Sequence, residues 1–193
     1  MSDTAVDFYY ERTAKESSDM VEHMPTLKAY ASKCDRVVEF GVWDCTSTWG
    51  LLGGHPKWMR SYDVVRQPEV DAVELATADS TTDFKFIIGS TVLDLTERLD
   101  LDQAMYCIQL EPTDLLFIDT FHTYYQLKQE FKLHAGKVGK YIILHDTTTF
   151  GDVDQTGKRP GLWQAVEEFL AEHTEWKLKE RFINCHGLTV LTR

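Results

Sequence analysis

Apolar runs of strand length alternate with segments of helical periodicity along most of the chain. Five predominantly apolar runs of strand length occur at residues 36–42, 58–65, 84–90, 114–120 and 139–148. The apolar spacing typical of helices occurs before, between and after them, at residues 24–34, 46–54, 68–78, 91–101, 123–137 and 161–173. Residues 176–193 indicate two further strands, joined by a turn at 184–187.

Strands that are apolar on both faces predict a parallel sheet covered by helices on both sides. The last two strands add an antiparallel hairpin. The sequence therefore predicts an α/β, single-domain, doubly wound (Rossmann-like) sheet of seven mostly parallel strands. Residues 24–193 are expected to form this domain. Residues 1–23, which carry the aromatic run Phe8–Tyr10, are expected to form an arm or a helix that could cover an active site.

The composition of the chain disfavours several classes of function. The net charge of −11 and the absence of a Lys/Arg-rich run disfavour binding to a nucleic-acid backbone. Four dispersed cysteines without a C-x-x-C pair argue against a cysteine-rich zinc site or a dense disulfide framework. No apolar run is long enough to span a bilayer, and the N-terminus lacks a signal-peptide pattern. We expect a cytoplasmic protein that acts on a small molecule, without nucleic-acid or membrane partners; self-association is left open.

Ligands of open α/β sheets bind beyond the carboxyl ends of the strands. The polar or glycine residues expected there are Glu39, Gly41, Asp44, Ser47, Asp63, Gly89, Ser90, Thr91, Asp119, His122, Tyr124, His145, Asp146 and Thr147. Taken singly, an aspartate at such a position is commonly a helix cap or a turn former. Asp63 could equally accept hydrogen bonds from ribose hydroxyls. Two carboxylates with two histidines, however, suit a cation or acid–base site.

The remaining histidines have no such context. His23, His55, His134, His173 and His186 are expected to be surface or loop residues.

The motif "VVEFGVWDCTSTW" at 37–49 resembles the first motif of class I S-adenosylmethionine-dependent methyltransferases. The segments 114–131, 139–151 and 160–170 are similar to those of small-molecule O-methyltransferases in the macrocin O-methyltransferase and cephalosporin hydroxylase-like group. The resemblance runs from about Met24 to the C-terminus. It implies an S-adenosylmethionine-dependent enzyme that methylates a hydroxyl of a small molecule or sugar.

The resemblance also implies roles for individual residues. The cofactor would contact Glu39, Gly41, Val42, Trp43, Ser47, Asp63, Ser90 and Asp119. Asp63 would accept the ribose hydroxyls, and Ser90 would lie near the adenine. Mg²⁺ or another divalent cation would bind Asp119 and Asp146, with His145 where several relatives carry an acidic residue. Further departures are Phe121 at the position of a catalytic carboxylate in some relatives, His122 at that of a lysine, and Cys45 at that of a glycine.

The mechanistic hypothesis assigns His122 as the general base, because imidazole titrates near neutral pH. Asp119 and His145 complete the catalytic set; without a metal, Asp119 would orient His122 or His145. The alternative is a non-catalytic binding protein with a methyltransferase fold. A nicotinamide-dependent oxidoreductase is disfavoured, because the pyrophosphate requires a three-glycine turn that this motif lacks. A nucleic-acid methyltransferase is disfavoured by the charge.

Overall fold

A seven-stranded sheet forms the centre of the computed structural model, which describes residues 3–92 and 108–193. The strand order is β3-β2-β1-β4-β5-β7-β6. Strands β1 to β5 are parallel, and β7 runs antiparallel to both β5 and β6. The strands are β1 Arg36–Phe40, β2 Trp58–Asp63, β3 Asp83–Ile88, β4 Thr113–Ile118, β5 Val138–His145, β6 Lys177–Phe182 and β7 Leu188–Thr192. The predicted mostly parallel sheet with a closing hairpin is confirmed.

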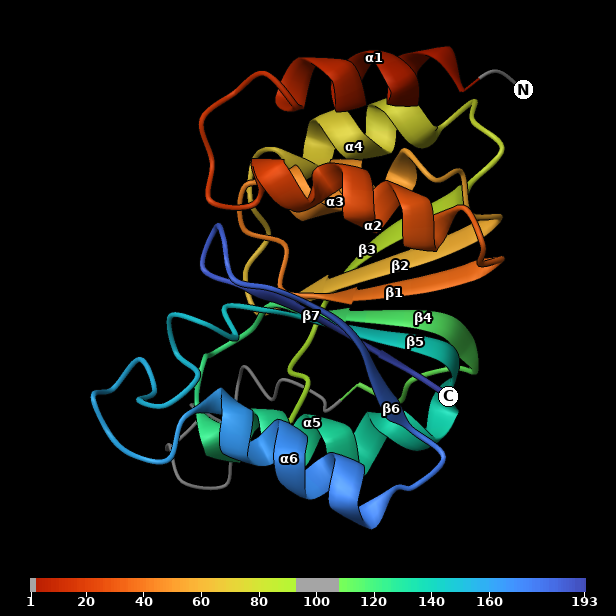
Figure 1. Cartoon of the computed structure of the whole chain (residues 1–193). Helices are drawn as coiled ribbons and strands as arrows, with labels where there is room; N and C mark the ends of the chain where they lie inside the picture. The colour runs from red at the N-terminus through yellow and green to blue at the C-terminus, as the bar shows by residue number, and fades with distance from the viewer. Residues whose placement is uncertain (1–2, 93–107) are drawn as a thin grey trace, which may run out of the picture.

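Helices cover both faces of this sheet (Figure 1). On one side lie α1 Thr4–Thr13, α2 Met24–Ala31, α3 Thr46–Leu52 and α4 Val70–Thr77, and on the other α5 Tyr124–His134 and α6 Leu162–Glu172. Short 3-10 turns, η1 Val21–His23 and η3 Ala135–Lys137, adjoin α2 and α5. The helix predicted at 91–101 lies, apart from its first two residues, outside the described residues.

Alternate side chains of the central strands enter two separate apolar layers. Val37 and Phe117 pack toward α1–α4, whereas Val38, Phe40 and Leu116 pack toward α5 and α6. Burial on both faces removes the polar alternation that a half-exposed strand would show. This is why the central strands appear in the sequence as predominantly apolar runs rather than as an alternation of apolar and polar residues.

The N-terminal residues form a helix that packs on α3 and α4. Tyr10 is buried, and the ring of Tyr9 stacks on Trp49 of α3 with centroids 4.7 Å apart. The chain then reaches the β6–β7 turn, where Nε2 of His23 donates to the Asn184 carbonyl at 3.1 Å. Among the described residues, no helix combines the length and apolar character that crossing a membrane requires.

The carboxyl ends of the parallel strands share one edge of the sheet. The long loop between β5 and α6 and the β6–β7 turn lie on that same side (Figure 1). Backbone N–H groups of Thr148 and Thr149 both donate to the His186 carbonyl, at 2.9 and 3.1 Å. The fold therefore gathers the polar strand ends, this loop and the hairpin turn around one region.

Candidate active site

Strand register brings Asp119 and His145 together. Ile118 of β4 pairs with Leu144 of β5, so the next residue along each strand is also a neighbour of the other. Nδ1 of His145 lies 3.3 Å from Oδ2 of Asp119. Asp146 follows with a φ of 60°, a left-handed conformation that is uncommon outside glycine and tends to occur at functional sites. The two predicted carboxylates thus share one site.

His122 bridges these carboxylates. Its Nε2 lies 3.0 Å from Oδ1 of Asp119 and 2.9 Å from Oδ2 of Asp146. Burial lowers the pKa of the ring, but the hydrogen bonds to Asp119 and Asp146 outweigh burial and raise the pKa to about 10. For Asp119, burial raises the pKa, but the contacts with His122 and His145 bring it down to about 2. In this arrangement His122 is a charged donor near neutral pH.

The role of His122 as general base therefore stays a prediction, and it requires the neutral form of the imidazole. Its Nε2 must first lose the proton that it donates to Asp119 and Asp146, because a protonated imidazole cannot accept another.

His145 presents an unused nitrogen to the carboxylates. Its Nε2 donates to the Cys185 carbonyl at 3.0 Å, so Nδ1 is the nitrogen that faces the carboxylates and carries a lone pair when the ring is neutral. Burial lowers the pKa of this ring, but the neighbouring Asp119 outweighs burial and raises it. Among the described residues, Nδ1 is buried without a hydrogen-bond partner; its nearest carboxylate oxygens are Oδ2 of Asp119 at 3.3 Å and Oδ2 of Asp146 at 3.6 Å. A buried nitrogen without a partner calls for an explanation, such as an ion.

These residues fit a divalent cation. Asp119, His145 and Asp146 each offer one ligand atom, and the three atoms lie within 4.8 Å of one another. Histidine ligands usually donate their other ring N–H to a carbonyl or carboxylate, as His145 does toward Cys185. A histidine beside two carboxylates favours a transition metal over Mg²⁺.

The turn after β1 lies directly against Asp119. Gly41 has a φ of 83°, and a Cβ at this position would overlap the carbonyl oxygen of Asp119. Cys45 also has a left-handed φ, of 64°, and is buried. A glycine adopts this conformation at the least cost, so Cys45 holds it against a steric penalty from its own Cβ. Trp43 is 77% exposed, so its indole can contact a ligand from the solvent side but does not line a closed pocket.

Glu39 lies beneath this turn and is completely buried. Its carboxylate accepts from Ser47 Oγ at 2.6 Å, Thr48 Oγ1 at 2.8 Å and Ser61 Oγ at 2.6 Å. Burial raises its pKa to about 7, even though the three hydroxyl donors act in the opposite direction. Glu39 thus ties α3 to β1 and β2 and supports the Gly41 turn from below.

Replacing Glu39 by glutamine should alter how stability depends on pH. A carboxyl with a pKa near 4.5 when unfolded and about 7 when folded binds more protons in the folded chain between those values. Its contribution therefore makes folding less favourable as pH rises through that window. Urea unfolding at several pH values should show wild type losing stability relative to Glu39→Gln from pH 4.5 to 7; parallel curves would contradict the assignment.

Asp63 organises the same turn from β2. Its Oδ2 accepts from the Val42 N–H at 2.8 Å and from the Trp43 N–H at 3.4 Å. Ser47 donates its hydroxyl to Glu39, and Ser90 donates its hydroxyl to the Val92 carbonyl at 2.6 Å. The turn-forming role of Asp63 is thus visible, and the cofactor contacts of these residues stay predictions.

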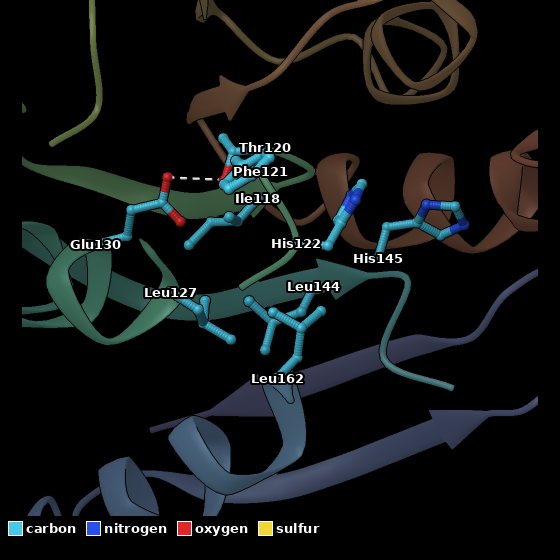
Figure 2. Close-up of a pocket in the computed structure, with 9 residues that line it drawn as sticks. All are labelled: Ile118, Thr120, Phe121, His122, Leu127, Glu130, Leu144, His145 and Leu162. Carbon is cyan, nitrogen blue, oxygen red and sulfur yellow. Dashed lines mark hydrogen bonds between the residues drawn. The ribbon is translucent and has the colours of Figure 1, made fainter. Parts of the chain in front are cut away.

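A small cavity lies behind the histidines (Figure 2). Glu130 of α5 lies on one side of it and His122 and His145 on the other. Glu130 is completely buried, and its Oε1 accepts from Thr91, Thr120 and Gln126. These bonds connect the segment after β4 to α5 and so support the loop that carries His122. The other lining residues are Ile118, Phe121, Leu127, Leu144 and Leu162.

Two of the histidines expected to be surface or loop residues are buried instead. His23 is 1% and His134 is 2% exposed, and each donates from Nε2 to backbone carbonyls. For His134 the sequence did carry a signal, since Leu127, Glu130 and Phe131 share its buried helical face. Nothing in the local pattern marks His23, whose carbonyl partners come from the distant hairpin turn.

Comparison of this structure with solved structures identifies its fold. No family model matches the sequence, and no curated protein matches it. The O-methyltransferase TomG of Streptomyces achromogenes, solved with S-adenosylmethionine, superposes with a TM-score of 0.64 at 14% identity, covering 100% of this chain and 90% of that one. The chain has the class I methyltransferase fold. The expected fold resemblance is thereby confirmed.

Two further solved methyltransferases share this fold. An O-methyltransferase of Bacillus cereus, solved with S-adenosylhomocysteine, has a TM-score of 0.62 at 14% identity, covering 100% of this chain and 92% of that one. The N-methyltransferase NodS of Bradyrhizobium japonicum, also with S-adenosylhomocysteine, has a TM-score of 0.58 at 13% identity, covering 97% and 98%. Because both acceptor types occur on this fold, the fold by itself leaves the acceptor atom open.

Proposed function

We propose that the protein is an S-adenosylmethionine-dependent methyltransferase that methylates a hydroxyl group of a small molecule or sugar. The observation that carries the proposal is the contact between two parts of one site. The Gly41 turn, which resembles a cofactor-binding motif, packs on the carbonyl of Asp119. Asp119 in turn contacts His122 and His145. A donor bound at the turn and an acceptor bound at the cluster would therefore be neighbours.

The residues around the turn fit the cofactor. Gly41 has no Cβ, so the turn can pack directly on the Asp119 backbone, which brings a donor bound at the turn close to the cluster. The partly exposed Asp63 carboxylate retains acceptor capacity for ribose hydroxyls, and Trp43 offers an exposed aromatic face. S-adenosylmethionine, when bound, supplies the methyl group on a sulfonium. The protein's contribution would be to hold donor and acceptor in line, which is a large part of what any enzyme can add to a displacement.

The cluster of Asp119, His122, His145 and Asp146 would receive the acceptor hydroxyl. A divalent cation held by Asp119, Asp146 and His145 would lower the pKa of that hydroxyl. His122, once its Nε2 proton has left, would accept the hydroxyl proton. The segment between α1 and α2 would approach the site through the contact of His23 with the hairpin turn, whereas α1 itself packs on α3 and α4.

Labelled methyl transfer to a panel of hydroxylated acceptors tests the proposal. We expect turnover that falls in excess chelator and returns with added Mn²⁺, Co²⁺ or Mg²⁺, the transition metals being more effective because of His145. Full activity in excess chelator would contradict the metal role.

The same assay, combined with a binding measurement, distinguishes a methyltransferase from a non-catalytic binding protein of the same fold. Saturable binding of S-adenosylmethionine without turnover on any acceptor would favour a non-catalytic binding protein of the same fold. Amine acceptors belong in the panel, because NodS shares the fold and is an N-methyltransferase. Methylation of amines alone would overturn the hydroxyl specificity and leave the methyltransferase proposal in place.

A further inference from the structure

The two ends of the loop between β5 and α6 are hydrogen-bonded to each other. Leu162 N–H donates to the Phe150 carbonyl at 2.8 Å, and Gly161 N–H donates to the Asp152 carbonyl at 2.9 Å. A Cβ on Gly161 would overlap the carbonyls of Phe150 and Gly151, so glycine allows the two ends to meet. A loop of this length with touching ends is an Ω-type loop, a class that is frequently functional.

Asp154 stiffens the far end of this loop. Its Oδ1 accepts from the Thr156 N–H at 2.9 Å, the Thr156 hydroxyl at 2.7 Å and the Lys158 N–H at 3.0 Å. The Asp154 N–H donates to the Lys158 carbonyl at 2.8 Å. The residue between these bonds, Gln155, is therefore held in place by its neighbours.

Gln155 reaches across to His122 and contacts it at three points. Its backbone N–H donates to the His122 carbonyl at 3.1 Å. Its Oε1 lies 2.8 Å from the His122 backbone nitrogen and 2.8 Å from Nδ1 of the His122 ring. Phe150, from the start of the same loop, stacks on that ring with centroids 5.0 Å apart and planes 11° apart.

These contacts fix the polarity of the imidazole. A backbone N–H can only donate, so the side-chain atom of Gln155 that faces it must be the carbonyl oxygen. Nδ1 of His122 contacts the same oxygen, and it must therefore carry a proton and donate as well. With Nδ1 engaged, Nε2 is the nitrogen that faces Asp119 and Asp146.

We propose that Gln155 is the positioning residue of His122: it holds Nδ1 as a donor and thereby directs Nε2 to the two carboxylates and the acceptor. The catalytic consequence rests on the proposed methyltransferase function, whereas the positioning itself does not. Gln155 acts from a loop remote in sequence and touches His122 alone among the cluster residues in the contacts described above.

Two substitutions of Gln155 distinguish its hydrogen bonds to His122 from its contribution to packing. Gln155→Glu keeps an oxygen that can accept from both His122 N–H groups. Gln155→Leu keeps a side chain of similar size but removes the acceptor. Gln164→Leu is the matched control, because the Gln164 side chain donates to Glu168 on the exposed face of α6, away from His122. Thermal unfolding of each variant verifies that it is folded.

Proton NMR of the histidine ring gives a readout independent of methyl transfer. We expect a protected Nδ1-bound proton signal of His122, assigned by its loss in His122→Asn. The signal should persist in wild type, Gln155→Glu and Gln164→Leu and be lost to solvent exchange in Gln155→Leu. In the methyl-transfer assay, Gln155→Leu should lower kcat by about 10- to 100-fold with little change in KM for S-adenosylmethionine, and Gln155→Glu should retain most activity.

The outcomes are distinguishable. An unchanged Nδ1 proton signal in Gln155→Leu would overturn the positioning. Loss of that signal together with wild-type kcat would overturn its catalytic consequence. If wild type methylates nothing, the NMR comparison still decides whether Gln155 positions His122, and the proposed function alone fails.

Discussion

Replacing Asp119 by asparagine is expected to lower kcat for methyl transfer by about 10²- to 10⁴-fold, the range typical of losing a group that handles protons in the transition state. Asp119 contacts both histidines of the cluster, with Oδ1 at 3.0 Å from His122 and Oδ2 at 3.3 Å from His145. Asparagine keeps the shape but removes the charge that both contacts require. Initial-rate kinetics with labelled S-adenosylmethionine measures the loss.

Asp79→Asn is the control for this substitution. Asp79 is exposed and follows α4, on the path to the amino end of β3 and away from the cluster. It should leave kcat unchanged. An unchanged kcat in Asp119→Asn would remove Asp119 from the reaction.

Replacing Gly41 by alanine is expected to weaken cofactor binding by about tenfold or more and to lower the free energy of unfolding by about 1–3 kcal/mol. The φ of 83° is unfavourable for alanine, and its Cβ would overlap the Asp119 carbonyl oxygen. The turn must therefore move away from β4, and under the proposed function it carries the backbone groups that would face the cofactor. Calorimetric titration and urea unfolding measure the two effects separately.

Gly136→Ala provides the matched control. A Cβ at Gly136 meets nothing within 4 Å, so this variant should match wild type in both measurements. Loss of stability in Gly41→Ala with unchanged affinity of the remaining folded protein would show that the turn does not contact the cofactor.

The fold was predictable because its cause is local and repeated. Val37 and Val38 point to opposite apolar layers, and such pairs recur along the central strands. Apolarity on both faces therefore appears in the sequence itself. The meeting of Asp119 with His145 was also predictable, because parallel neighbouring strands place their carboxyl ends side by side.

The charge state of His122 was not predictable from the strand pattern. It depends on the left-handed φ of Asp146 and on the contact of its carboxylate with Nε2 of His122 at 2.9 Å. It also depends on Gln155, which reaches His122 only because Gly161 lets the loop close. Backbone conformation and loop closure arise from tertiary packing, and neither has a periodic signature.

Cys45 is a second case in which the sequence pattern alone does not predict the backbone conformation. A cysteine at a motif glycine suggests a damaged site when only the sequence is considered. In the structure Cys45 keeps the left-handed φ of 64° that glycine would adopt, with its side chain buried in the core under α3. The turn thus keeps a glycine-like conformation at Cys45 at some conformational cost.

Calorimetric titration of the purified protein with S-adenosylmethionine and S-adenosylhomocysteine tests the central claim most directly. We predict a single saturable site for each compound, weakened when Asp63 is replaced by alanine, because Asp63 holds the N–H groups of Val42 and Trp43 in the turn. Absence of saturable binding of both compounds to the folded wild-type protein would contradict the assignment of this sheet edge as a methyl-donor site.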